Sequence, residues 1–222
     1  PEKIFDVAVQ ALTVDFETAM RIESRGLAEL ALTPQAKNMI NTFFFQMNKI
    51  NGGASRPKEI PPQKTEKVGI LGAGMMGQGI AYSSAMVGIK VVLKDLSLEA
   101  AEKGKAYTET LLQKRVDKGR MTPAKMADVL ALIHPTASDE DLDGCDLIIE
   151  AVFENMKLKH QMTRDLESRL ADGGVWGSNT STLPITQLAE ASQNAETFIG
   201  IHFFSPVDKM PLVEIIMGEK TG

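Results

Sequence analysis

The chain has 222 residues, enough for one good-sized hydrophobic core and a smaller additional segment. Hydrophobic residues make up 43% and charged residues 24%, and the net charge of −5 gives no reason to expect nucleic-acid binding. One cysteine, Cys145, excludes an internal disulfide, and no apolar run approaches the roughly 18 residues that a membrane-spanning helix needs. We therefore expect a cytoplasmic globular protein.

The first part of the chain, residues 1–50, shows the spacing of amphipathic helices. Thr33 followed by Pro34 predicts a helix start, because threonine caps the first turn and proline fits the first helical position. One apolar stripe beyond it is formed by Ile40, Phe43, Phe44, Met47 and Ile50. Two or three such helices bury little against one another, so we expect their stripes to pack on another part of the protein rather than to bind a ligand.

Residues 51–66 have the composition of a linker. They contain almost no apolar side chains, and their turn-forming residues are Gly52, Gly53, Pro57, Pro61 and Pro62. We place a domain boundary here, between a helical segment at 1–50 and a larger domain at 67–222.

A glycine-rich turn opens the larger domain. The apolar run Lys67–Leu71 predicts a strand, which leads through three spaced glycines into an apolar helical pattern. In such a turn the first glycine permits tight bending, the second lets a pyrophosphate approach the backbone, and the third allows close packing of helix on sheet. The candidate cofactor-binding residues of this turn are Gly72, Gly74, Met75, Met76 and Gly77.

An acidic residue stands where a dinucleotide site requires one. The run Lys90–Lys94 predicts a second strand, and Asp95 follows it, about 18 residues after Gly77. A carboxylate here accepts hydrogen bonds from ribose hydroxyls and repels a 2′-phosphate, so the sequence predicts NAD rather than NADP.

Strand and helix patterns then alternate, which predicts an α/β fold with a Rossmann-type, doubly wound and mostly parallel sheet. Further strands are expected at 145–152, 174–180, 197–204 and 211–217, and helices at 157–170 and 184–191. Two helices, one at 97–119 and one from Thr122 that carries Ile133, precede the first of these strands. They form either a hairpin over the site or a cover for one sheet face, and the sequence leaves both open.

The acidic stretch from Asp139 to Glu150 matches the letter pattern of a calcium-binding loop without its context. Such a loop lies between two helices, whereas Gly144 leads directly into an apolar strand, and the usually apolar eighth position is Asp146. We interpret the stretch as a solvated acidic loop and expect no metal site.

His202, near a predicted strand end, is the best candidate for a general base, because histidine titrates near neutral pH. Glu214 in the next predicted strand could pair with the imidazole across the sheet, and Ser181 could hydrogen-bond a substrate oxygen. Taken alone, His202 is explained equally well as a core histidine beside Phe203 and Phe204. A buried Glu214, which needs a partner, favours the catalytic interpretation.

Four segments carry a family resemblance. They are Gly-Ala-Gly-Met-Met-Gly-Gln-Gly-Ile-Ala at 72–81, Glu-Ala-Val-Phe-Glu-Asn at 150–155, Asn-Thr-Ser at 179–181, and His-Phe-Phe-Ser-Pro at 202–206 with Leu-Val-Glu at 212–214. From Lys67 onward the chain therefore resembles the NAD-binding domain of L-3-hydroxyacyl-CoA dehydrogenases. Residues 1–66 resemble, less specifically, the connection between the hydratase and dehydrogenase halves of multifunctional fatty-acid oxidation enzymes.

This resemblance implies that NAD+ oxidises an L-3-hydroxyacyl-CoA to a 3-ketoacyl-CoA in fatty-acid β-oxidation. It makes His202 the base on the 3-hydroxyl, Glu214 its electrostatic partner, and Ser181 a ligand of the substrate oxygen.

The same resemblance implies a cofactor site and a substrate arm. Asp95 would bind the adenosine ribose, and the cofactor side of the cleft would also contain Glu154, Lys159 and Asn179. The helical pair 97–133 would be the arm that contacts CoA.

Two features depart from the family pattern. Ser205 stands where the family usually has asparagine, which puts a contact to cofactor or substrate in question. The chain also begins at Pro1 and ends at Gly222, without the hydratase core upstream or the helical domain that would close the cleft and mediate dimerisation. We therefore expect a fragment of a longer enzyme, with those domains and a possible homo-oligomer as its partners, that binds NAD with little or no turnover.

Two other functions compete with this interpretation. A dehydrogenase of small 3-hydroxy acids shares the glycine-rich opening but would use a lysine base, and the segment at 202–206 argues against it. An NAD-sensing or docking module without hydride transfer would instead use residues 1–50 to bind a partner.

Overall fold

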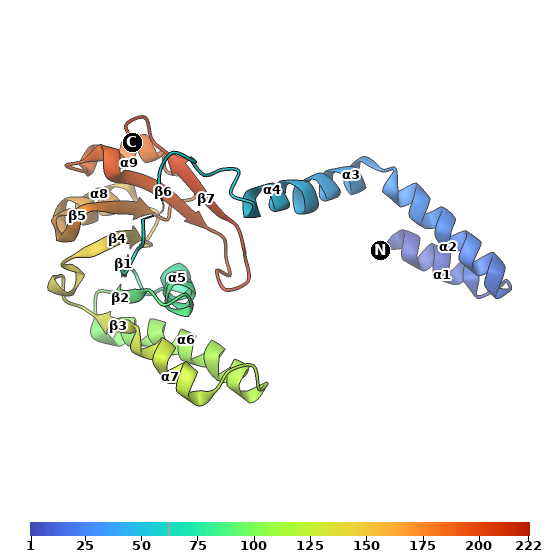
Figure 1. Ribbon diagram of the computed structural model, residues 1–222, viewed down its shortest axis with the longest axis horizontal. Helices are drawn as coiled ribbons and strands as arrows, with labels where there is room; N and C mark the ends of the chain where they lie inside the picture. The colour runs from blue at the N-terminus through green and yellow to red at the C-terminus, as the bar shows by residue number, and fades with distance from the viewer. Residues whose placement is uncertain (62) are drawn as a thin grey trace. The chain divides into compact units, whose positions relative to one another are not determined.

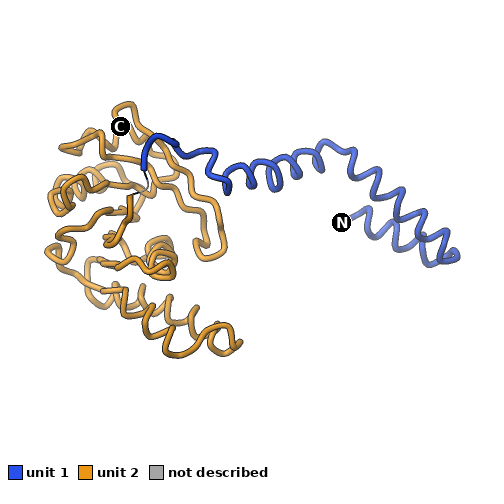
Figure 2. Tube along the Cα trace, viewed as in Figure 1, with its two compact units in different colours: residues 1–62 blue, residues 63–222 orange. Residues whose placement is uncertain are grey.

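The computed structural model describes residues 1–61 and 63–222 (Figure 1). The chain divides into two compact units, residues 1–62 and residues 63–222 (Figure 2). This division lies within the stretch 51–66, and Pro62, one of the prolines of the expected linker, lies outside the described residues.

Unit 1 consists of helices. They are α1 (Glu2–Ala11), α2 (Phe16–Ala31), α3 (Pro34–Ile40), a π-helical segment (Asn41–Gln46) and α4 (Met47–Asn51). The predicted start at Thr33 is confirmed, because its hydroxyl accepts a hydrogen bond from the N–H of Ala36 at 3.2 Å and Pro34 opens α3. Asp15 caps α2 in the same way, accepting from the N–H of Thr18 at 3.0 Å.

Unit 1 has little interior of its own. Among its described residues only Gly26 is buried, where α2 approaches α1 so closely that an added Cβ would lie 2.8 Å from the side chain of Val7. Large apolar side chains stay exposed, with Leu12 at 86%, Phe16 at 80% and Phe43 at 71% of their surface. The apolar stripes predicted from the sequence are thus left uncovered within the unit.

Unit 2 contains a seven-stranded sheet in the order β3-β2-β1-β4-β5-β6-β7. The strands are β1 (Lys67–Leu71), β2 (Lys90–Lys94), β3 (Ile133–Thr136), β4 (Cys145–Glu150), β5 (Leu170–Ser178), β6 (Phe198–Phe203) and β7 (Val213–Met217). The pairs from β3 through β6 are parallel, and only β7 runs antiparallel to its neighbour. The predicted doubly wound, mostly parallel sheet is confirmed.

Helices cover both faces of this sheet (Figure 1). They are α5 (Met75–Met86), α6 (Leu98–Asp117), α7 (Pro123–Ala131), α8 (Met156–Leu166) and α9 (Ile185–Leu188). One core cluster joins the sheet to α5, α6 and α7 through residues such as Ile80, Leu112 and Val129. A second joins it to α8 and α9 through Leu166 and Leu188. Of the helices in the described parts of the chain, none combines the length and the apolar character needed to cross a membrane.

The α6–α7 pair covers a sheet face and also extends into solvent. Leu112 of α6 and Val129 of α7 are buried against the sheet, while Lys118 and Arg120 in the turn between the helices are exposed. The arrangement in which the pair covers one sheet face is therefore confirmed, and the position of the hairpin over the site stays a prediction.

Several predicted boundaries were wrong, and the largest errors lie at two helix ends and at the start of the strand expected at 174–180. Ile133 does not belong to the second helix but begins β3, an edge strand where Pro135, which has no N–H to donate, is tolerated. The helix expected at 157–170 ends at Leu166, and Leu170 already begins β5 opposite Cys145. A register irregularity between Cys145 and Leu147 allows β5 to be this long.

Candidate active site

The glycine-rich turn has the steric requirements that its spacing predicts. Gly72 has a positive φ of +95°, and a Cβ on it would lie 2.8 Å from the carbonyl oxygen of Ala151. A Cβ on Gly77 would lie 1.7 Å from the carbonyl oxygen of Gly72, so only glycine fits where α5 crosses the turn. A Cβ on Gly74, in contrast, would meet nothing within 4 Å.

This open space lies at the N-terminus of α5, which Gly74 directly precedes, with Met75 and Met76 in its first turn. The first N–H groups of a helix lack intrahelical acceptors, and the helix dipole favours negative charge there. The turn therefore fits the diphosphate of a dinucleotide, which would fill the space beside Gly74.

Asp95 is held in a fixed orientation beside the turn. Its carboxylate accepts hydrogen bonds from the backbone N–H of Ala73 and of Leu96, each at 2.7 Å. These bonds leave further lone pairs of the carboxylate for hydroxyl donors. The geometry suits a ribose bound through its two hydroxyls.

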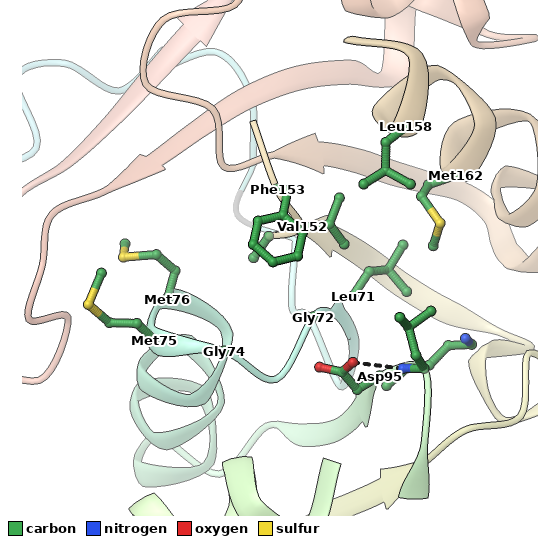
Figure 3. Close-up of a pocket in the computed structure, with 13 residues that line it drawn as sticks. Leu71, Gly72, Gly74, Met75, Met76, Asp95, Val152, Phe153, Leu158 and Met162 are labelled. Carbon is green, nitrogen blue, oxygen red and sulfur yellow. Dashed lines mark hydrogen bonds between the residues drawn. The ribbon is translucent and has the colours of Figure 1, made fainter. Parts of the chain in front are cut away.

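A cavity of about 380 Å³ opens next to Asp95. In Figure 3, Leu158 and Met162 point from α8 toward Leu71 at the end of β1, with Val152 and Phe153 beside them. The residues that line this cavity are Leu71, Gly72, Gly74, Met75, Met76, Lys94, Asp95, Leu96, Ala151, Val152, Phe153, Leu158 and Met162. Apolar walls beside a single carboxylate suit a base and its ribose, so the residues present fit the adenosine part of NAD.

Glu154 lies in the loop between β4 and α8, outside the set of residues that line this cavity, and its carboxylate contacts the turn that follows β5. Its Oε1 accepts hydrogen bonds from the hydroxyl of Thr180 at 2.5 Å and from the N–H groups of Ser181 and Thr182 at 3.0 and 3.2 Å. Burial disfavours the charged form of Glu154, but these bonds and the nearby Lys159 outweigh it and lower the pKa of its carboxyl to about 2. Glu154 is therefore a permanent anion at neutral pH.

Lys159 is only 1% exposed and does not line the cavity. Its Nζ donates to both carboxylate oxygens of Glu150, at 2.8 and 3.0 Å, and lies 3.3 Å from Oε2 of Glu154. The resemblance implied that Lys159 faces the cofactor; the structure places its ammonium between two carboxylates, behind Glu154.

Asn179, between Ser178 and Thr180, links neighbouring strands. Its backbone N–H donates to the carbonyl of Glu150 at 2.8 Å, and its Oδ1 accepts from the N–H of Phe203 at 2.9 Å. The ends of β4, β5 and β6 are thus joined at one edge of the sheet.

His202 and Glu214 are directly opposite each other in the antiparallel β6–β7 pair. His202 Nδ1 lies 2.7 Å from Glu214 Oε2, so the predicted pair is in contact. The His202 side chain is 19% exposed, whereas that of Glu214 is 52% exposed, so the expectation of a buried Glu214 was wrong. The His202 ring lies 4.6 Å from that of Phe204, centroid to centroid. With Nδ1 bound to the carboxylate, Nε2 is the nitrogen that can accept a proton.

The segment after His202 contacts the start of α5. The hydroxyl of Ser205 donates to Sδ of Met75 at 3.7 Å, and Val207 packs where a Cβ on Gly79 would meet it at 2.8 Å. These contacts link the end of β6 to the helix that follows the glycine-rich turn.

The residues of the calcium-like pattern have other partners. Glu150 binds Lys159, and Asp141 accepts a hydrogen bond from the hydroxyl of Thr136 at 2.5 Å. Within residues 1–61 and 63–222, His, Cys, Asp and Glu side chains form no group of three or more that could hold a metal ion.

Sequence reasoning missed the roles of Glu150 and Thr180. Glu150 ends an apolar strand and is 1% exposed, and Thr180 is 2% exposed. A carboxylate at the end of a buried run requires a partner, and that requirement was the available signal.

A parallel sheet with a glycine-rich turn, an acidic residue after β2 and polar groups at the strand ends defines a doubly wound dinucleotide-binding domain. The profile of the family "3-hydroxyacyl-CoA dehydrogenase, NAD binding domain" matches residues 67–222. The chain belongs to this family, and its cofactor is NAD.

Curated relatives match the whole chain or nearly all of it. It is 38% identical over 222 residues to the fatty acid oxidation complex subunit alpha of Acinetobacter baylyi, covering 100% of this chain and 31% of that protein. It is 42% identical over 206 residues to the protein of the same name from Pseudomonas entomophila, covering 93% of this chain and 28% of the relative. The chain thus spans less than a third of the length of these relatives.

Solved structures of dehydrogenases share the fold. (S)-3-hydroxybutyryl-CoA dehydrogenase from Ralstonia eutropha superposes with a TM-score of 0.69 at 41% identity, over 72% of this chain and 56% of that one. The 3-hydroxybutyryl-CoA dehydrogenase of Escherichia coli K12 gives a TM-score of 0.69 at 32% identity, over 72% of this chain and 34% of that one.

Proposed function

We propose that this chain is the NAD-binding part of an enzyme that oxidises L-3-hydroxyacyl-CoA to 3-ketoacyl-CoA. The observation that carries the proposal is the 2.7 Å contact of His202 with Glu214, on a strand whose following segment contacts the start of α5. A histidine paired with a carboxylate near a dinucleotide turn is suited to remove a proton from an alcohol.

Three side chains would act on the substrate hydroxyl. Nε2 of His202 accepts the proton of the 3-hydroxyl, and Glu214 stabilises the imidazolium that forms. Ser181 donates a hydrogen bond to the substrate oxygen and holds it near His202. When bound, NAD+ supplies the hydride acceptor.

The cofactor would be held by the turn from Gly72 to Gly77 and by Asp95. Glu154 and Asn179 fix the segments at the ends of β5 and β6. The ammonium of Lys159 is buried, so Lys159 would act on the cofactor site only through its contact with Glu154.

The proposal includes the setting of the whole protein. The chain matches under a third of the length of proteins named fatty acid oxidation complex subunit alpha. We propose a cytoplasmic protein with a hydratase module upstream and a helical domain downstream, the latter closing the cleft and supporting oligomerisation. The α6–α7 pair would contact the CoA part of the substrate.

The test is acetoacetyl-CoA-dependent oxidation of NADH by a full-length protein that contains this chain. We expect turnover, a loss of about 100-fold or more in kcat for His202→Gln, and a Kd for NADH within about threefold of the original. Full activity of the variant would overturn the assignment. NADH binding that alters affinity for a protein partner, without any hydride transfer, would support the NAD-sensing function instead.

A further inference from the structure

Three charged side chains connect the end of β4 to the turn after β5. Glu150 ends β4, Lys159 lies on α8, and Glu154 lies in the loop between these two elements. They approach one another in the order Glu150, Lys159, Glu154, and the last of them binds the turn that contains Ser181.

Glu150 is fixed from all sides. Its carboxylate is 1% exposed and receives hydrogen bonds from the N–H of Val152 and the hydroxyl of Ser178, both at 2.8 Å, besides the two from Lys159. A buried anion with this many donors has one allowed position, and it sets the position of the lysine that donates to it.

The two oxygens of Glu154 have different partners. Oε2 faces Lys159 at 3.3 Å, whereas Oε1 accepts from Thr180, Ser181 and Thr182. The place of Oε1 therefore depends on where Lys159 holds Oε2. If Lys159 lost Glu150, Glu154 would be its only remaining ionic partner among residues 1–61 and 63–222, and Glu154 would be drawn inward, away from the turn.

We propose that Glu150 is a positioning residue for Ser181, acting through Lys159 and Glu154. The side chain of Glu150 contacts neither Ser181 nor Thr182. It binds the ammonium of Lys159, which faces Oε2 of Glu154, and Oε1 of Glu154 accepts from the N–H of Ser181. The role of Ser181 in catalysis rests on the proposed function; the coupling between Glu150 and the turn does not.

The experiment is hydrogen exchange of backbone amides in the ligand-free protein. Glu150→Gln is expected to speed exchange at Ser181 and Thr182 by about tenfold or more. The backbone amide of Ile149, in β4, is expected to keep its exchange rate. Because no cofactor or substrate is present, this result stands whether or not the dehydrogenase activity is found. Unchanged exchange at Ser181 and Thr182 in a folded Glu150→Gln variant overturns the proposal.

Glu167→Gln is a matched control. Glu167 is also a buried carboxylate, 8% exposed, and it also holds a turn by accepting from the N–H of Gln193 at 2.7 Å, but it lies beyond the other end of α8. This variant is expected to speed exchange at Gln193 and to leave Ser181 unchanged. Equal acceleration at Ser181 in both variants would indicate general destabilisation and overturn the proposal.

The double variant Glu150→Gln with Lys159→Met keeps the test decisive if the single variant fails to fold. It leaves no unpaired buried ion, so its stability is expected to recover. Its Ser181 and Thr182 amides are still expected to exchange about tenfold faster, because Oε2 of Glu154 has lost its anchor. Slow exchange in the folded double variant would refute the coupling.

Discussion

The Oδ1 atom of Asn179 accepts a hydrogen bond from the backbone N–H of Phe203, with 2.9 Å between the two atoms. Asn179 follows β5, and Phe203 follows His202 in β6, beyond the last parallel pair that joins these strands at Ser178 and Gly200. The position of His202 at the end of β6 therefore depends on a side chain from the neighbouring strand.

Replacing Asn179 with alanine tests this dependence. We expect a loss of about 1 kcal/mol in the free energy of unfolding, because the N–H of Phe203 loses its acceptor, and faster amide exchange at Phe203. Asn155→Ala is the control, since Asn155 caps α8 by accepting from the N–H of Leu158 at 3.1 Å. Asn155→Ala is expected to cost a similar free energy of unfolding without changing the rate of amide exchange at Phe203. Equal exchange at Phe203 in the two variants would contradict the prediction.

Alanine at two glycines of the turn should separate folding from binding. Gly74→Ala is expected to keep the melting temperature, because its Cβ enters open space, and to weaken NADH binding about tenfold or more by occupying the place of the diphosphate. Gly77→Ala is expected to cost about 3 kcal/mol or more of stability, because its Cβ would overlap the carbonyl of Gly72. Calorimetric melting and NADH fluorescence titration measure both effects. A stable Gly77→Ala protein would show that α5 can move away from the turn.

Asp95→Asn should relax the choice of cofactor. Removing the charge that opposes a 2′-phosphate is expected to reduce the preference for NADH over NADPH by about tenfold, measured as the ratio of the two Kd values. Glu99→Gln removes the same charge from the first turn of α6 and serves as the control, with an unchanged ratio expected. An equal shift of the ratio in both variants would show that cofactor preference follows the overall electrostatic field of the domain rather than a contact between Asp95 and the ribose.

Glu154 should make stability depend on acid pH. The pKa of its carboxyl is about 2 in the folded protein and 4.5 as the ordinary value, so the stabilisation is complete above pH 4.5 and disappears as the pH falls toward 2. Because the side chain is 37% exposed, we expect about 1 to 2 kcal/mol after allowing for solvent screening. Urea unfolding of the original protein and of Glu154→Gln at pH 6 and pH 3 measures it. The difference between the two proteins should narrow at pH 3, and a constant difference would contradict the assignment.

The fold was predictable where side chains leave a periodic signal. The apolar run before Gly72, the glycine spacing and the placement of Asp95 fix strand, turn and helix locally, so the first βαβ unit could be predicted. The edge strand β3 was missed because its sequence, Ile-His-Pro-Thr, has a single large apolar residue and contains a proline.

The site was predictable where partners face each other across a regular ladder. His202 and Glu214 could be paired because two adjacent strands bring a histidine opposite a carboxylate. The burial of Lys159 could not be predicted, since nothing in a helical lysine shows whether it points to solvent or to a buried Glu150. That distinction depends on how α8 packs on the sheet.

Trp176 is the only tryptophan of the chain, and it lies in β5 with none of its surface exposed. It stands two residues before Ser178, whose hydroxyl binds Glu150. An indole enclosed in this way emits at short wavelength, and its emission overlaps the absorption of reduced nicotinamide. We therefore expect the emission of Trp176 to report both unfolding of the core and binding of NADH, without any added label.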